Sequence, residues 1–290
     1  MADARTAPAA TDPRVRTPGS GSLTADQIAA YRAEGFCFPF TAMSTQAAQA
    51  YCDRLEQFER QHGQRASQIL RQKSHLVLTF IDEIIRLDAI LDAVQSLIGP
   101  DILCWSTSFF IKNPGDGRFI SWHQDASYWG LEADDIVTAW IALSDSHLAN
   151  GCMKIARRTH LALLPHNDRP EAGNMLTRGQ EVAATVDERD VVPIELARGQ
   201  FSLHHHQIVH GSGPNLGSTR RIGLAIRYVR PTARQVVDAH DTAMLVRGVD
   251  RHGHFQAEPR PRCDMDPAGI EFLEAALAVR AGGVFRRVRA

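Results

Sequence analysis

Cysteine is scarce and scattered in this chain of 290 residues. The five cysteines are odd in number, widely spaced and without a Cys-x-x-Cys pair: Cys37, Cys52, Cys104, Cys152 and Cys263. A disulfide framework or a zinc knuckle needs an even set of cysteines at short, regular spacings. The sequence therefore argues against both classes, and we expect reduced thiols in a cytoplasmic protein.

Long apolar runs and charge clusters are also missing. No apolar run approaches the roughly 20 residues of a membrane span, and residues 1–22 lack the apolar core of a secretory signal. The 32 basic and 33 acidic side chains nearly cancel, and the arginines are scattered, so no patch suits nucleic acid. We expect a soluble globular protein with a disordered tail over residues 1–22 and with no nucleic-acid or membrane partner.

Helix signals dominate the chain up to about residue 100. Thr24 and Gln27 have the spacing of a capping box, and Ser44 is a second helix-capping residue. Gly35, Gly63 and Gly99 follow the last residues of helical periodicity, as glycine does at helix ends. The expected helices cover residues 24–35, 44–62 and 88–98, with a strand at residues 36–40.

Strand signals take over from residue 102. Residues 102–112 are rich in aromatic, β-branched and hydroxyl side chains and end in the turn at 113–117. Further strands are expected at residues 119–124, 136–143, 152–156, 191–196, 200–206 and 221–229. The segment 157–188 is long, polar and without clear period, which is typical of a lid or binding loop.

This order of elements predicts one domain. Many short strands after a helical start, with no helix–strand alternation, favour a mainly β fold with flanking helices, and a jelly-roll barrel fits best. The expected domain spans residues 23–290, with a helical part to about 100, a jelly-roll core at about 101–230 and a C-terminal extension at 231–290. That extension has one expected helix, at residues 267–280.

The segment 121–129 holds a candidate metal site. His123 and Asp125 form a His-x-Asp pair in a segment that is typical of a strand, where side chains two residues apart point to the same side. An imidazole and a carboxylate converging there supply two of the three ligands of a facial iron site. The neighbouring Trp122, Tyr128 and Trp129 suit a pocket wall or ordinary core packing.

The third ligand has two candidates by spacing alone. His204 and His206 belong to a triple histidine and share one face of an expected strand, whereas His210 precedes the turn at residues 211–215. A strand that begins near residue 221 can return alongside a metal bound at His210. Arg220 or Arg221 can there form the bidentate pair that a dicarboxylate requires.

Several motifs together resemble bacterial members of the phytanoyl-CoA dioxygenase family, in the same order and over about residues 23–262. The segments that carry the resemblance are 110–115, 121–125, 137–140, 150–153 and 210–215. The resemblance implies a double-stranded β-helix, a kind of jelly roll. It also implies an oxygenase that uses Fe(II), 2-oxoglutarate and O2.

Carried over position by position, the resemblance assigns the site residues. It places the metal ligands at His123, Asp125 and His210, and the carboxylate anchor at Arg221 in preference to Arg220. The residues that it places near the cosubstrate are Ser212, Gln124, Trp140 and Lys112, and those that it places near the substrate are Trp129 and Tyr128.

Two positions bear on the reaction. Arg157 and Arg158 stand where relatives commonly have a Pro-Gly-Ser-His turn, and they face either an anionic substrate or water. Asp125 is retained, whereas related halogenases have a small residue there that makes room for chloride, so hydroxylation is expected.

The expected function is hydroxylation of a C–H bond in a small metabolite, such as an amino acid, an amine or a natural-product intermediate, with release of succinate and CO2. One alternative keeps the reaction but tethers the substrate to coenzyme A or to a carrier protein as partner. The other, from a different class, is a non-catalytic jelly-roll protein that binds a ligand or a metal.

Overall fold

The computed structural model describes residues 21–133, 136–176, 178–237 and 240–283. All but two residues of the tail expected at 1–22 lie outside these ranges. None of the described helices is both long and apolar enough to cross a membrane.

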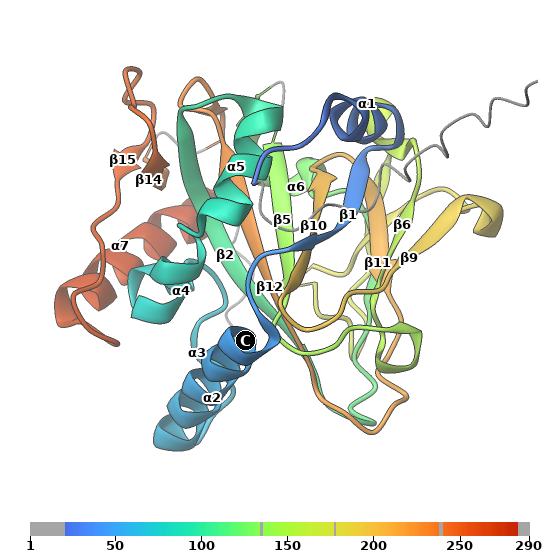
Figure 1. Cartoon of the computed structure of the whole chain (residues 1–290), viewed down its shortest axis with the longest axis horizontal. Helices are drawn as coiled ribbons and strands as arrows, with labels where there is room; N and C mark the ends of the chain where they lie inside the picture. The colour runs from blue at the N-terminus through green and yellow to red at the C-terminus, as the bar shows by residue number, and fades with distance from the viewer. Residues whose placement is uncertain (1–20, 134–135, 177, 238–239, 284–290) are drawn as a thin grey trace, which may run out of the picture.

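Two β-sheets form the centre of the molecule (Figure 1). The large sheet has the strand order β1 (Phe36–Thr41), β10 (Gln200–His205), β5 (Ile136–Ala142), β12 (Arg221–Val229), β2 (Ile102–Lys112), β14 (Thr242–Arg247) and β15 (Gln256–Ala257). The small sheet has the order β3 (Ile120–His123), β11 (Val209–Ser212), β6 (Met153–Ala156) and β9 (Val191–Ile194). Most neighbouring strands are antiparallel, β14 with β15 being the parallel pair. The expected mainly β jelly-roll fold is confirmed.

Alternation along the strands of the large sheet separates a core face from a cavity face. On β12, Ile222, Leu224 and Ile226 belong to the main hydrophobic core, whereas Arg221 and Arg227 line a cavity on the opposite face. This is the period of two that a strand imposes on its side chains. The large sheet therefore presents an apolar face to one layer, and to the small sheet a mixed face on which the two arginines accompany a second apolar cluster.

Helices cover the apolar face of the large sheet, as Figure 1 shows for α4, α5 and α7. The helices that contribute to this core are α1 (Ala25–Glu34), α2 (Thr45–His62), α3 (Ala66–Ile69), α4 (Thr79–Ile84), α5 (Asp88–Ile98) and α7 (Pro267–Gly283), with the short turn η1 (Ser74–Leu76). The α5 side chains facing the sheet recur at helical spacing and include Ile90, Leu91, Val94 and Leu97.

The helix boundaries follow from capping residues. Thr24 forms the expected capping box with Gln27, and α1 ends at Gly35 in the left-handed conformation, with φ 85°. Ser44 accepts a hydrogen bond from the backbone N–H of Ala47 at the start of α2. The three helices expected in the first third of the chain are confirmed.

Several elements were not expected. The helices α3 and α4 have only four and six residues, too few for a clear helical period. The sheet also continues past residue 230, because β14 pairs with β2. Further short elements are α6 (Ala126–Trp129), β4 (Leu131–Glu132) paired with β13 (Arg234–Gln235), and η2 (Leu148–Asn150).

A buried polar cluster fastens the C-terminal extension to the sheet. Glu258 lies 2.5 Å from the ammonium of Lys73 and 2.7 Å from Nε2 of His75, and all three side chains are fully buried. Lys73 also donates to the carbonyl oxygens of Trp105 and Thr242. Buried charges of opposite sign at this distance satisfy one another, so residues after 240 are part of the folded domain.

The segment 157–188 is ordered by short elements. It contains η3 (Thr159–Leu161), the hairpin of β7 (His166–Asp168) and β8 (Gln180–Val182), and η4 (Glu188–Asp190). The hydroxyl of Ser121 on β3 contacts the carbonyl oxygen of Gln180, and Asn174 donates to the same hydroxyl. The hairpin therefore packs against the strand that leads to His123.

Candidate active site

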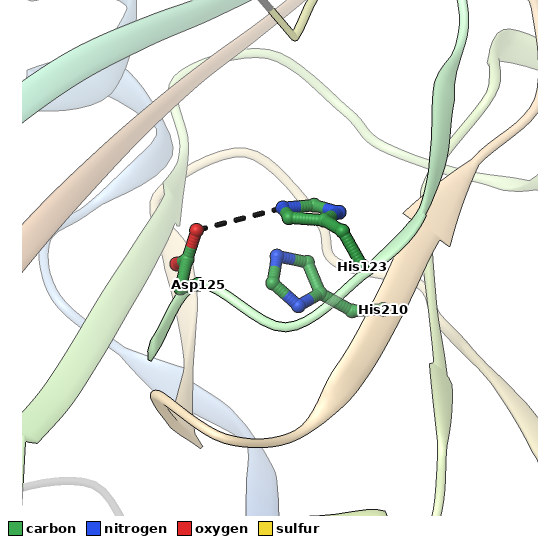
Figure 2. Close-up of side chains that lie close together, drawn as sticks. All are labelled: His123, Asp125 and His210. Carbon is green, nitrogen blue, oxygen red and sulfur yellow. Dashed lines mark ion pairs between the residues drawn. The ribbon is translucent and has the colours of Figure 1, made fainter. Parts of the chain in front are cut away.

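Strand pairing brings two histidines face to face. His123 on β3 is the register partner of His210 on β11, and their ring centroids are 4.2 Å apart. Nε2 of His123 lies 3.5 Å from Oδ1 of Asp125. One potential ligand atom from each of these three side chains lies within 4.8 Å of the others, and all three converge on one point (Figure 2).

Asp125 reaches this point by a turn and not by strand alternation. Strand β3 ends at His123, and Asp125 has helical dihedral angles, φ −56° and ψ −38°, at the start of α6. The backbone N–H of Tyr128 donates to the carbonyl oxygen of Asp125 at 3.1 Å, which closes the turn. The expectation that one strand carries both side chains was wrong, although the two side chains do converge.

Backbone carbonyls fix the orientation of both imidazoles. Nδ1 of His123 lies 3.0 Å from the carbonyl oxygen of Ser121, and Nδ1 of His210 lies 3.0 Å from that of Ile208. When Nδ1–H donates to the carbonyl, the lone pair of Nε2 is left for a metal. Each ring is therefore held in the tautomer that a metal ligand needs.

Electrostatics favour the metal-binding protonation states of His210 and Asp125. Burial, helped by the charge of His123, lowers the pKa of His210 to about 4. Burial alone would raise the pKa of Asp125, but His123, His210 and Arg227 outweigh it and the pKa lies well below the usual range. At neutral pH the site offers a neutral imidazole and a carboxylate, the forms that bind metals.

The alternative histidine pair is not formed. His204 lines the cavity, with its ring centroid 5.0 Å from that of His210. Strand β10 ends at His205, and the ring of His206 lies against His205 with centroids 4.3 Å apart. Among the described residues, the group with metal-ligand geometry is His123, Asp125 and His210.

The two neighbouring arginines point in different directions. Arg220 donates to both carboxylate oxygens of Glu59 on α2, at 2.8 and 2.9 Å. Arg221 is 1% exposed, lines the cavity and contacts the carbonyl oxygen of Gly151. Burial lowers the pKa of Arg221 only to about 10, so it is a cation at neutral pH, and no carboxylate of the described residues forms an ion pair with it.

Lys112 lies beside Arg221 as its register partner on β2. Its buried ammonium donates to Oγ of Ser212 at 2.6 Å, and Ser212 lines the cavity. Burial, together with the charge of Arg221, lowers the pKa of Lys112 to about 6. Arg221 in the cavity wall and Lys112 behind Ser212 are therefore adjacent basic groups, which a carboxylate in the cavity would stabilise.

Gln124 lies between the two candidate ligands of the His-x-Asp pair, but its side chain is not part of the cavity lining. Its fully buried amide donates to the carbonyl oxygens of Ala162 and Gln207 and accepts from the N–H of Leu164 at 2.7 Å. The structure therefore places this side chain as a brace between the ligand turn and the segment 157–188.

Trp140 lies in the cavity wall with its indole over Gly223, which has no side chain. The Arg221 guanidinium is 5.5 Å from the Trp140 ring centroid, within the range of a cation–π contact. A Cβ at position 223 would overlap the indole ring. Gly223 therefore leaves the room that the indole occupies beside the Arg221 guanidinium.

Gly223→Ala is expected to displace this indole. The overlap should cost about 1–3 kcal/mol of unfolding free energy, as overpacking does, and should weaken binding of a dicarboxylate at Arg221 about tenfold. Denaturant unfolding and calorimetric titration with 2-oxoglutarate measure the two effects. Gly213→Ala is the control because a Cβ there meets no atom within 4 Å; equal effects of both changes would contradict the role of the indole.

The two aromatic residues expected near a substrate lie outside the cavity lining. Trp129 packs on Trp105, with ring centroids 5.2 Å apart, and on the Arg227 guanidinium at 5.6 Å. Tyr128 meets the ring of His166 edge-on at 5.5 Å. Trp129 thus contacts Arg227, which lines the cavity, but does not line the cavity itself. Tyr128 faces the β7–β8 hairpin.

Arg157 and Arg158 are directed away from the cavity. Both lie near Glu34 at the end of α1, at 3.9 and 2.9 Å respectively. The Arg158 side chain is 60% exposed and that of Arg157 is 38% exposed, so of the two expected environments the structure agrees with water, with Glu34 as an added partner.

His166 links the hairpin to the metal-ligand turn, and nothing in the sequence pattern singled it out. Its Nε2 accepts the backbone N–H of Gln124 at 2.9 Å, and its Nδ1 lies 2.8 Å from the carbonyl oxygen of Leu164. Burial lowers the pKa of His166, which keeps Nε2 unprotonated and able to accept.

His166→Leu is expected to loosen the turn that carries His123 and Asp125. Partners of metal ligands typically contribute roughly 10–100-fold to metal affinity, and we expect a loss in this range. Calorimetric titration with Ni(II) measures it. His166→Gln retains an acceptor and should recover part of the affinity; equal affinity in the leucine variant and the unmodified protein would show that the contact does not position the ligands.

Comparison with known proteins adds the family. The family model described as "Phytanoyl-CoA dioxygenase (PhyH)" matches residues 20–223. The non-heme monooxygenase ThoJ, solved in its apo form, is 37% identical, with a TM-score of 0.79 over 89% of this chain and 97% of that one. Its nickel complex is 34% identical, with a TM-score of 0.73 over 88% of this chain and 97% of that one.

Two curated relatives match over shorter stretches. A probable alpha-ketoglutarate-dependent hypophosphite dioxygenase of Stutzerimonas stutzeri is 28% identical over 184 residues, 61% of this chain and 63% of that protein. The L-proline trans-4-hydroxylase of Streptomyces griseoviridis is 27% identical over 169 residues, 51% of this chain and 62% of that protein. The chain thus spans less than two thirds of the length of either relative. With the family model matching most of the chain, this protein belongs to the phytanoyl-CoA dioxygenase family.

Proposed function

We propose that this protein is an Fe(II)- and 2-oxoglutarate-dependent dioxygenase that hydroxylates a C–H bond of a small metabolite. One observation carries the proposal: a single cavity between the two sheets is lined both by the trio His123, Asp125 and His210 and by the buried cation Arg221. A jelly roll that merely packed its core would have no use for this combination, because each of these groups loses hydration on burial.

The donor set fits iron. Two imidazole nitrogens and one carboxylate oxygen that converge from one side form the facial arrangement of non-heme Fe(II) oxygenases. Bound iron and 2-oxoglutarate supply oxygen activation and the oxidation of the C–H bond, with succinate and CO2 as coproducts. Asp125 occupies the ligand position that a halogenase leaves open for chloride, which supports hydroxylation.

The residues of this chain hold and orient the cosubstrate. Arg221 offers the planar fork that grips the distal carboxylate of 2-oxoglutarate. The ammonium of Lys112 donates to the hydroxyl of Ser212 and is a second basic group near the cosubstrate. The Trp140 ring covers the Arg221 guanidinium. We propose that Gln124 supports the turn that carries His123 and Asp125, because its amide donates a hydrogen bond to the carbonyl oxygen of Ala162.

A small substrate is supported by the relatives whose names identify one. Hypophosphite and L-proline, named for two of them, are both compact molecules. Other relatives are named for phytanoyl-CoA, a thioester that corresponds to the tethered alternative. We place the substrate on the side of the metal ligands where Arg227 and Trp129 lie, opposite Arg221. Tyr128 is assigned to the wall between this side and the hairpin.

Succinate formation tests the proposed function. Protein incubated with Fe(II), ascorbate, air and 2-oxoglutarate should release succinate, and a panel of amino acids, amines, phosphonates and acyl thioesters should raise that rate for the substrate class. Product mass then identifies an added oxygen. Absence of succinate under every condition, together with no binding of Fe(II), would favour a non-catalytic ligand-binding protein, and a response to thioesters alone would favour a tethered substrate.

A further inference from the structure

Three polar side chains form a row across the cavity face of the large sheet. His204 on β10 is the register partner of Thr138 on β5, which is in turn the register partner of Arg227 on β12. All three line the cavity that holds the metal-ligand trio, and all three are buried. Strand register therefore places an imidazole, a hydroxyl and a guanidinium side by side.

Two members of the row have polar atoms that the described protein does not satisfy. Oγ1 of Thr138 and Nδ1 of His204 are buried and have no hydrogen-bond partner among the described residues, and each residue is only 1% exposed. Buried hydroxyl and ring nitrogen atoms are normally bonded. Their position in the cavity wall indicates that a bound molecule supplies the partner.

Arg227 gives the row its charge. Its Nη1 donates to Oγ of Ser108 at 2.7 Å, and its guanidinium lies 5.9 Å from the ring of Phe110 and 5.6 Å from that of Trp129. These contacts hold the guanidinium flat in the wall. An imidazole N–H, a hydroxyl and a guanidinium can all donate, so an oxyanion fits the row better than a cation or an apolar group.

The row is separate from the anchor assigned to the cosubstrate. Arg221 and Arg227 are six residues apart on β12, which corresponds to about 20 Å along the strand at 3.3 Å per residue. Both arginines line the cavity with the metal-ligand trio, and the charge of Arg227, not that of Arg221, contributes to the lowered pKa values of Asp125 and His210. A cosubstrate held by Arg221 and the metal leaves the row for another molecule.

We infer that His204, Thr138 and Arg227 form a second oxyanion subsite, which binds a carboxylate or similar anionic group of the substrate. The inference rests on the proposed function and narrows it to anionic small molecules. It also assigns a role to one member of the triple histidine: His204 contacts the substrate and does not bind the metal. The 1-carboxylate of 2-oxoglutarate is also an oxyanion and is the other candidate occupant of this subsite. The experiment distinguishes it from a carboxylate of the substrate.

Matched acid and amide pairs test the subsite. Ni(II)-loaded protein saturated with 2-oxoglutarate is titrated with amino acids and their carboxamides, and binding is followed by calorimetry and by the change in melting temperature. At least one acid should bind ten or more times as tightly as its amide. Thr138→Val and Arg227→Met should each reduce that preference at least tenfold and change the affinity for 2-oxoglutarate less than threefold.

Controls separate the possible failures. Arg220→Met removes a guanidinium that lies outside the cavity and should leave the preference intact; if Arg227→Met does not fold, Arg227→Lys and Thr138→Val carry the test. If no acid binds more tightly than its amide, or if the Thr138 and Arg227 variants weaken 2-oxoglutarate as much as the acid, the inference is overturned. A failed proposed function gives a different result, because the acid preference would persist without any succinate formation in the Fe(II) protein.

Discussion

The variant His210→Ala is expected to lose Fe(II) affinity by at least about 100-fold and 2-oxoglutarate turnover to background. His210 supplies one of only two imidazoles in the trio, and its Nε2 is freed for metal by the bond from Nδ1 to the carbonyl oxygen of Ile208. Loss of a partner to a metal ligand already costs roughly 10–100-fold, so loss of the ligand itself should cost more. Anaerobic calorimetry with Fe(II) and a succinate assay measure the two quantities.

Two other histidines provide matched controls. His204→Ala removes an imidazole from the same cavity, and its metal affinity should stay within about threefold of the unmodified protein, because its ring is not part of the ligand trio. His206→Ala removes a ring that lies against His205 instead of the cavity, and both metal affinity and turnover should persist. The reverse pattern, with His210→Ala active and His204→Ala inactive, would show that the ligand set is wrong.

Local signals in the sequence predicted much of the fold. The capping residues Thr24 and Ser44 mark the starts of α1 and α2, and the expected strands at 102–112 and 221–229 have the bounds of β2 and β12. These features depend on neighbours in the chain, such as a side chain that caps a backbone N–H three residues ahead. Elements with little local periodicity, such as α4 and the β7–β8 hairpin, were missed.

The candidate site was only partly accessible from the sequence because its geometry depends on register between distant strands. Spacing alone could not choose between His204 and His210; the pairing of β11 with β3 places His210 opposite His123. Asp125 was expected on a strand and lies in a turn. Arg227 carried a usable signal, since it lies an even number of residues from Arg221 on one strand and therefore on the same face.

The roles of the site residues are predictions of different kinds. Those of His123, Asp125 and His210 rest on convergence of their ligand atoms, whereas that of Arg221 rests on its burial without a carboxylate partner in the part of the chain that the structure describes. Gln124 shows why position in a motif is not sufficient. It stands between two expected ligands, yet its side chain binds the loop at Ala162.

Arg221→Ala is expected to weaken 2-oxoglutarate binding by roughly 10–150-fold while leaving metal affinity nearly unchanged. A hydrogen bond to a charged group contributes about 1.5–3 kcal/mol, and this guanidinium is the fully buried cation that lines the cavity beside Ser212. Calorimetric titration of the Ni(II)-loaded protein with 2-oxoglutarate gives the affinity directly. Retained metal binding distinguishes this variant from His210→Ala.

Arg220→Ala is the matched control, since it removes the adjacent guanidinium, which pairs with Glu59 on α2. Its affinity for 2-oxoglutarate should match that of the unmodified protein; a loss in this variant instead of Arg221→Ala would place the anchor one residue away. Arg221→Lys should recover only part of the affinity, because an ammonium keeps the charge but not the planar fork that grips a carboxylate with two bonds. Full recovery by lysine would mean that the cavity selects its cosubstrate by charge alone, and the cover that Trp140 gives the guanidinium would then be unnecessary for binding.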